Sequence, residues 1–435
     1  MRFAMVAKAA PTAGAPRRFR LRYDIAVEWR LRTARRLALS SGQAKLTRPE
    51  RLALVGLLLT PFALLLDYRL GLGLIEQKRT FNSYVENFGL PVSYTQVFGA
   101  AQALWIVLAI IALGRRGSRG GFASPSAVCL IGLSVLILAI TASLDEVDSH
   151  TELDLASTVV PLIAIVGVLL HPSVRLKTVR GLILVFASTT AAITAGTILF
   201  DLLRGELGQR FDLFLFGSPT YTGIVLAMTL VLLVPVRGPR WIKAPLMMTI
   251  GLGLLLTQTR GAQAAAICGL LVLAVGDRRL RVATLAALVA LIGASVLLSS
   301  RSLFSLSDAS FHLRSNQVAR HWQLFLAHPS YGYGLSAESV PFTTGSDNTI
   351  LGLANAAGVG AAILWLAAWS QPTIAALVRL RKEPAVIGAA AVLVAAFVAW
   401  MTTGGEVLTY APPTNLLPLA LALALARSAR QESRA

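Results

Sequence analysis

Six arginines beyond residue 200 lie away from the basic clusters that separate the apolar runs of the chain. They are Arg204, Arg210, Arg260, Arg301, Arg314 and Arg320. Arg260 is the only charged residue between positions 245 and 275, and a charge inside such an apolar stretch is costly and suggests a functional site. A guanidinium pairs with phosphate through two hydrogen bonds and stays charged. Several of them converging would therefore suit a phosphate or pyrophosphate, whereas Arg204 is expected to be a solvated loop charge and Arg301 an interface anchor. The alternative for Arg260 is an interfacial anchor that reaches lipid phosphates.

Groups that could move a proton follow the last of these arginines. Asp347 opens an apolar run, and His321 and His328 lie in the polar segment before it. Such groups can take a proton from an attacking hydroxyl. A partly buried carboxylate is a good base but one beside arginines is a weak base, so either histidine is an alternative, and Asp347 could instead cap a helix that begins at Asn348. The aromatic face of Tyr333 could stack on a sugar ring.

Other chemistries lack the residues they need. No cluster of His, Cys, Asp or Glu has the spacing of metal ligands, and we expect no metal and no cofactor. There is no Gly-rich phosphate loop and no Ser/His/Asp order typical of a hydrolase. Cys129 and Cys268 both lie in apolar runs, so they are expected to be small core residues.

The composition indicates which kind of structural element carries these arginines and proton-transfer groups. Of 435 residues, 55% are hydrophobic and 14% are charged, whereas soluble proteins have about 25% charged residues. We therefore predict an all-α integral membrane protein with about twelve transmembrane helices and one larger outer loop. The predicted spans are residues 52–66, 97–113, 124–144, 155–170, 181–200, 219–236, 245–259, 261–275, 282–299, 348–369, 385–403 and 413–426.

The basic residues orient these spans. The net charge is +19, but the Lys and Arg residues form short clusters between apolar runs, as in cytoplasmic loops, which argues against nucleic acid as a partner. Both termini are then cytoplasmic and the six arginines are on the outer side. The segments are a basic N-terminal segment 1–51, spans within 52–299, an outer loop 300–347, spans within 348–426 and a cytoplasmic tail 427–435.

Two local features are expected near the candidate site. Residues 245–275 would extend about 46 Å as one helix, against a hydrocarbon core of ~30 Å. Because both flanks are basic, two short spans should meet at Arg260, with Gly261 providing the sharp turn. In the outer loop, residues 310–327 should form an amphipathic helix that ends before Pro329. Trp322, with Leu313, Val318 and Phe325, is expected to pack in the core of that loop, with sugar stacking as the alternative.

Four segments carry a resemblance to a known family. Residues 257–262 (TQTRGA) are similar to its S-x-S-R-G-A segment, and residues 208–221 contain its arginine and a similar start of a span. Residues 320–334 resemble its R-x-x-x-W and h-P-x-x-G-x-G outer loop, and residues 347–360 its H-N-x-x-L and G-x-x-G segment. Together they resemble the O-antigen ligase and polysaccharide polymerase superfamily of bacterial membrane glycosyltransferases.

The resemblance implies a metal-independent enzyme of the bacterial inner membrane whose active site faces the periplasm. Its donor would be a polyprenyl-pyrophosphate-linked glycan held by membrane lipid, and its acceptor a hydroxyl of a glycan or lipid-linked sugar. Arg210 and Arg260 would bind the pyrophosphate and neutralise its developing charge. Beside these two, Arg314 and Arg320 could contact the glycan, contact the phosphate or form a salt bridge within the loop, and His321 and Tyr333 are the other candidate substrate-binding residues.

One position departs from the family pattern, because Asp347 stands where the family has histidine. Polymerases and ligases differ only in the acceptor, and the missing histidine favours a polymerase. The alternative function is a transporter of an anionic solute. Transporters of this size show internal repeats and sites at mid-depth, whereas this chain shows no repeat and its conspicuous residues gather at the outer surface.

Overall fold

The computed structural model describes a large part of the chain. The described residues are 47–48, 50–56, 58, 76–80, 83–87, 104, 107–108, 110–111, 124–143, 162–203, 219–276, 281–298, 309–334, 348–377, 384–402 and 416–434.

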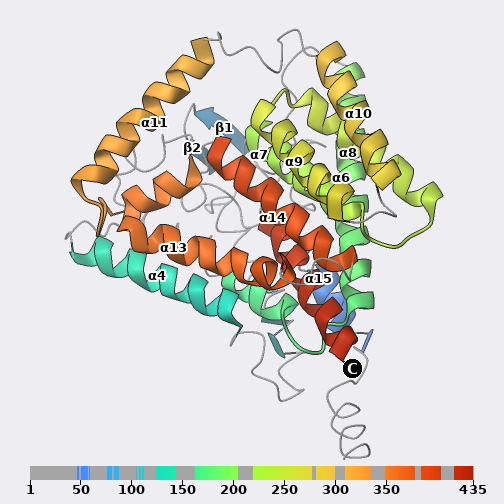
Figure 1. Ribbon diagram of the computed structural model, residues 1–435, viewed down its shortest axis with the longest axis horizontal. Coiled ribbons are helices and arrows are strands. Elements are labelled where there is room, and N and C mark those ends of the chain that lie inside the picture. The colour runs from blue at the N-terminus through green and yellow to red at the C-terminus, as the bar shows by residue number, and fades with distance from the viewer. Residues whose placement is uncertain are drawn as a thin grey trace, which may run out of the picture. The chain divides into compact units, whose positions relative to one another are not determined.

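This part of the chain is predominantly helical (Figure 1). The labelled helices are α4 (Pro125–Ser143), α6 (Leu176–Leu203), α7 (Pro219–Leu233), α8 (Arg240–Leu256), α9 (Arg260–Gly276), α10 (Arg281–Leu298), α11 (Ala309–Ala327), α13 (Thr349–Leu377), α14 (Pro384–Thr402) and α15 (Leu417–Arg434). Residues 162–169, within the predicted span 155–170, are also helical. An antiparallel hairpin of β1 (Glu76–Thr80) and β2 (Ser83–Asn87) departs from the all-α prediction. Thr80, Tyr84 and Val85 are residue types that favour strands.

Four described helices are long and apolar enough to cross a membrane: Pro125–Ser143, Leu176–Leu203, Thr349–Ser370 and Pro384–Thr402. Each coincides with a predicted span. The apolar helices α7 and α9 are shorter, and most of the predicted spans 52–66 and 97–113 lies outside the described residues. The structure therefore supports a helical membrane protein, and the number twelve stays a prediction.

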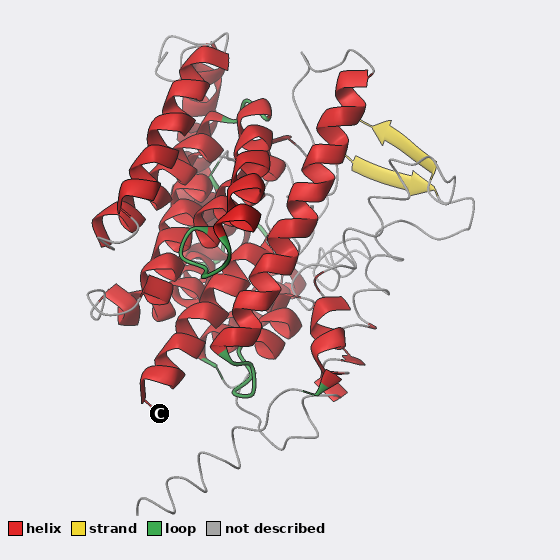
Figure 2. Cartoon of the chain, turned by 90° about the vertical axis from the view of Figure 1, so that its right-hand side faces the viewer, coloured by secondary structure: helices red, strands yellow, loops and turns green. Residues whose placement is uncertain are grey.

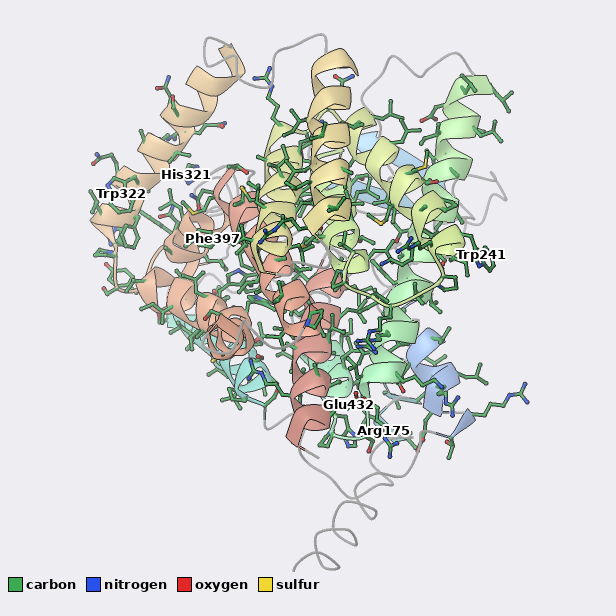
Figure 3. All side chains as sticks on the ribbon, turned by 45° about the vertical axis from the view of Figure 1, so that its right-hand side comes forward. Arg175, Trp241, His321, Trp322, Phe397 and Glu432 are labelled. Carbon is green, nitrogen blue, oxygen red and sulfur yellow. The ribbon has the colours of Figure 1, made fainter. Side chains whose placement is uncertain are left out.

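Exposed apolar faces support the same conclusion. Val128, Ile131 and Val135 follow helical spacing on α4 and are between 41 and 60% exposed. On α8, Trp241 is 76% and Met248 75% exposed, and Figure 3 shows Trp241 pointing away from the helices. Contiguous apolar faces of this kind are unfavourable in water. They indicate helices that face lipid.

The core lies where helices distant in the sequence pack together (Figures 1 and 2). α14 packs along α9 and α15, and α13 packs along α4. Trp365 and Trp369 of α13 are fully buried, and the ring of Trp365 lies 5.3 Å from that of Trp400 on α14. Cys129 and Cys268, expected in the core, are half-buried free thiols on α4 and α9.

The last helix is longer than predicted. α15 continues to Arg434, through residues that were predicted to form a tail. The hydroxyl of Ser428 donates a 3.0 Å hydrogen bond to the carbonyl of Val174, just before α6. Ala429 is also buried. The end of the apolar run at residue 426 thus does not end the helix, because tertiary packing and good helix formers extend it.

Candidate functional site

The turn that carries Arg260 joins α8 to α9 over three residues. α8 ends at Leu256 and α9 begins at Arg260. Gln258 has φ +52°, and no other non-glycine residue in the described part of the chain has a positive φ. The reversal therefore takes place at Gln258. The prediction that Gly261 provides the turn is wrong, because Gly261 lies buried in the first turn of α9.

Two buried threonines close this turn with their side chains. The hydroxyl of Thr257 donates to the carbonyl of Leu254 at 2.8 Å, and its oxygen accepts the amide of Thr259 at 3.4 Å. The hydroxyl of Thr259 donates to the carbonyl of Thr257 at 3.3 Å. Such local bonds compete with a continuing helix. They explain why the apolar run breaks here, and this role of the threonines was not recognised from the sequence.

A glycine of α7 lets the neighbouring helix approach the turn. A Cβ atom on Gly223 would lie 2.9 Å from the Cβ of Ala262 and 3.0 Å from the hydroxyl oxygen of Thr257. Only a residue without a side chain fits this contact. Arg260 is half-buried at this packed turn, whereas the side chain of Gln258 is exposed. A positive φ at a residue other than glycine costs about 1–2 kcal/mol, so the turn holds Gln258 against an intrinsic preference.

The helix predicted over residues 310–327 is present, but on it His321 is buried and Trp322 is not. α11 covers Ala309–Ala327 and ends before Pro329. His321 is 4% exposed and Trp322 is 50% exposed. Figure 3 shows His321 on the inner side of α11 and Trp322 on the outer side. The prediction that Trp322 packs in the core is wrong, because α11 turns the adjacent His321 toward α13.

The residues after α11 pack onto a break in α13. Ala357 and Gly358 have non-helical backbone angles in the middle of α13. The amides of Tyr333 and Gly334 donate to the carbonyls of Asn355 and Ala356 at 2.7 and 2.9 Å. In return, the amide of Val359 donates to the carbonyl of Pro329 at 2.9 Å. Residues 329–334 thus satisfy the backbone groups that the break releases, as an apolar environment requires.

Two glycines make this contact possible. Gly358 has φ +72° and Gly332 has φ +70°. A Cβ atom on Gly358 would clash with the backbone of Ser330, and one on Gly332 would clash with the carbonyl of Asn355. Both positions therefore need glycine for conformation and for space.

The aromatic residues of the same segment are fixed by short contacts. The hydroxyl of Tyr333 donates to the carbonyl of Leu324 at 3.2 Å. Nδ1 of His328 lies 2.7 Å from the hydroxyl oxygen of Tyr331, and the ring of His328 meets that of Tyr333 edge to face at 4.9 Å. Tyr331 is 46% exposed. Tyr331 therefore presents the more accessible ring, although the sequence singled out Tyr333.

The start of α13 has its own cap. Oδ1 of Asn348 accepts the amides of Ile350 and Leu351 at 3.1 and 3.0 Å. Asn348 thus fills the capping role considered for Asp347.

The structure describes some of the predicted site residues and does not bring all of those together. Arg210 and Asp347 lie outside the described residues, and Arg314 is described only as part of the α11 backbone. His321 and Tyr333 both contact Asn355, which sequence reasoning missed. Arg320 is exposed on α11. Arg260 lies apart from these residues, at the start of α9, a helix that packs against α7, α10 and α14.

Comparison with known proteins adds no assignment: no protein-family model matches the chain, and no curated protein matches it. Among the described residues, no group of three His, Cys, Asp or Glu side chains could hold a metal ion. The described residues therefore offer two separate groups: Arg260 with the exposed amide of Gln258 at the start of α9, and the His321–Asn355–Tyr333 cluster between α11 and α13.

Proposed function

We propose that the protein is a metal-independent glycosyltransferase of the bacterial inner membrane. It transfers an oligosaccharide from a polyprenyl-pyrophosphate carrier to a sugar hydroxyl on the periplasmic side, as an O-antigen or exopolysaccharide polymerase or an O-antigen ligase. The observation that carries the proposal is the half-buried Arg260 at a packed turn between two apolar helices. A permanent cation in that position suits an anion whose lipid tail lies in the membrane.

The reaction needs little from the protein beyond charge and position. The acceptor oxygen forms a bond to C1 of the donor sugar while the bond from C1 to the pyrophosphate oxygen breaks. Negative charge develops on the leaving pyrophosphate, where Arg260 stabilises it together with Arg210. The membrane restricts the carrier lipid and so orients the donor.

The described contacts narrow the choice of base. Nδ2 of Asn355 lies 3.2 Å from the carbonyl oxygen of His321, which can only accept, so the amide nitrogen faces that oxygen. The same nitrogen lies 3.1 Å from Nδ1 of His321, which must then also accept. His321 therefore carries its proton on Nε2 and serves as a donor. Because Asn348 caps α13, Asp347 is not needed there, and Asp347 and His328 remain the two candidates for the base.

The break in α13 is the one feature that favours the alternative, an anion transporter. Interrupted spans often form transport sites because their free backbone groups bind the solute. Here residues 329–334 occupy the released groups of Asn355, Ala356 and Val359. The break is filled by the protein itself, which supports the enzyme.

A reconstituted assay tests the proposal. Purified protein in lipid vesicles receives a polyprenyl-pyrophosphate oligosaccharide, with and without a separate glycan acceptor, and chain growth or transfer is measured. Arg260→Ala should reduce transfer by about 100-fold or more, as loss of a charge-stabilising group does. The exposed Arg240, at the opposite end of α8, gives the matched control, since Arg240→Ala should keep most activity. Absence of transfer with any acceptor, together with anion flux that depends on Arg260, would establish the transporter instead.

A further inference from the structure

Gln258 holds an unusual combination of backbone and side chain. Its backbone has φ +52°, a conformation that glycine, asparagine or aspartate adopts more readily. Its side chain is exposed, and the side-chain hydrogen bonds that close the turn come from Thr257 and Thr259. Neither packing nor the turn therefore requires a glutamine here, and strained residues of this kind are concentrated at functional sites.

The position of Gln258 relates it to Arg260. Gln258 lies in the turn between α8 and α9, and Arg260, two positions further on, is the first residue of α9. Arginine offers only donors, which suits a pyrophosphate. The amide of glutamine offers donors and an acceptor on one planar group, which suits a hydroxyl or N-acetyl group. In a lipid-linked donor, the first sugar is bonded directly to the pyrophosphate.

We infer that Gln258 is a specificity-determining residue that hydrogen-bonds the first sugar of the donor while Arg260 binds the adjacent pyrophosphate. This inference rests on the proposed function. Asparagine would tolerate the backbone better, and glutamine differs from it by one further methylene of reach.

Binding to two lipids separates the two residues. The full-length protein in nanodiscs is titrated with polyprenyl pyrophosphate and with polyprenyl-pyrophosphate oligosaccharide, for wild type, Gln258→Gly and Arg260→Gln. Gln258→Gly should bind the glycosylated lipid about 5- to 10-fold more weakly, the loss of one or two hydrogen bonds. Its affinity for the bare pyrophosphate lipid should not change. Arg260→Gln should weaken binding of both lipids.

The thermal unfolding temperature excludes a purely structural effect. Glycine adopts a positive φ without the steric cost that glutamine has at position 258. Gln258→Gly should therefore unfold at the same or a higher temperature than wild type. A lower unfolding temperature with weaker binding of both lipids would make Gln258 a structural residue and overturn the inference. Unchanged binding of both lipids by Gln258→Gly would overturn it too, while leaving the proposed function in place. If wild type binds neither lipid, the proposed function fails first.

Discussion

Nδ2 of Asn355 lies 3.1 Å from Nδ1 of His321 and 3.2 Å from the carbonyl oxygen of the same residue, 34 positions earlier in the chain. Asn355 is fully buried, and its own carbonyl accepts the amide of Tyr333. One residue of α13 therefore fixes the end of α11, the ring of His321 and the segment that follows. This cluster holds α11 against α13.

Replacing Asn355 should loosen this contact. Asn355→Ala removes two side-chain hydrogen bonds and leaves buried acceptors on His321, which should lower the free energy of unfolding by about 2–3 kcal/mol. Thermal unfolding of the purified protein measures this. Asn316→Ala on the exposed face of α11 is the matched control and should leave the unfolding temperature nearly unchanged. Equal effects of the two substitutions would contradict the role of Asn355.

Gly358 should be among the least tolerant positions of the chain. Gly358→Ala adds a Cβ that clashes with the backbone of Ser330 and forces a positive φ on alanine, so we expect a loss of about 3 kcal/mol or more. Gly181 in α6 has open space around its Cα, and Gly181→Ala should stabilise by up to about 1 kcal/mol. Comparing the unfolding temperatures of the two variants tests both expectations, and a stable Gly358→Ala protein would show that the segment 329–334 does not need this contact.

Fluorescence can test which helix faces meet lipid. In nanodiscs that contain brominated lipid, the exposed Trp241 should be quenched, and the buried Trp365 should not. Trp241→Phe should therefore lower the quenched fraction of the total emission, whereas Trp365→Phe should raise it. If both substitutions change the fraction equally, α8 does not face lipid with its exposed side.

Lys243, which precedes the predicted span 245–259, should contribute to the pH dependence of the free energy of unfolding. Its Nζ donates to the carbonyls of Val234 and Val236 at 2.8 Å each, beyond the end of α7. Burial lowers the pKa of Lys243 below its ordinary value of 10.5. Between the lowered pKa and 10.5 the unfolded state binds more protons than the folded state, so Lys243 makes stability rise with pH in that window.

The variant Lys243→Met removes this contribution. The unfolding temperature of wild type, relative to the variant, should increase as pH is raised from neutral toward 10.5. Lys177→Met, at an exposed lysine of α6, controls for the loss of a positive charge. A constant difference between wild type and Lys243→Met across this range would contradict the prediction.

The sequence predicted helix positions well where hydrophobicity alone decides them. The apolar runs 124–144 and 385–403 correspond to α4 and α14 within a residue or two, and the amphipathic pattern of 310–327 corresponds to α11. Pro329 and the following glycines also indicated correctly where α11 ends. Each of these signals is local, because it depends on residues within one segment.

Features that depend on contacts between segments were not predictable in this way. The turn occurs at Gln258 rather than at Gly261, because the threonine side chains and the close approach of Gly223 determine it. His321 is buried instead of the larger Trp322, because Asn355 provides a partner for its polar atoms. Periodicity gave no sign of the break in α13, since the glycine at 358 reads like any other small residue of an apolar helix.

The packing of residues 329–334 on α13 also has a consequence for biogenesis. Without this segment, the carbonyls of Asn355 and Ala356 and the amide of Val359 would be left unpaired within an apolar helix, at a cost of several kcal/mol each. α13 is therefore not an autonomous unit of membrane insertion. The ribosome makes its partner segment first, so the order of synthesis protects the broken helix, and a circular permutation that reverses this order should impair assembly of the protein.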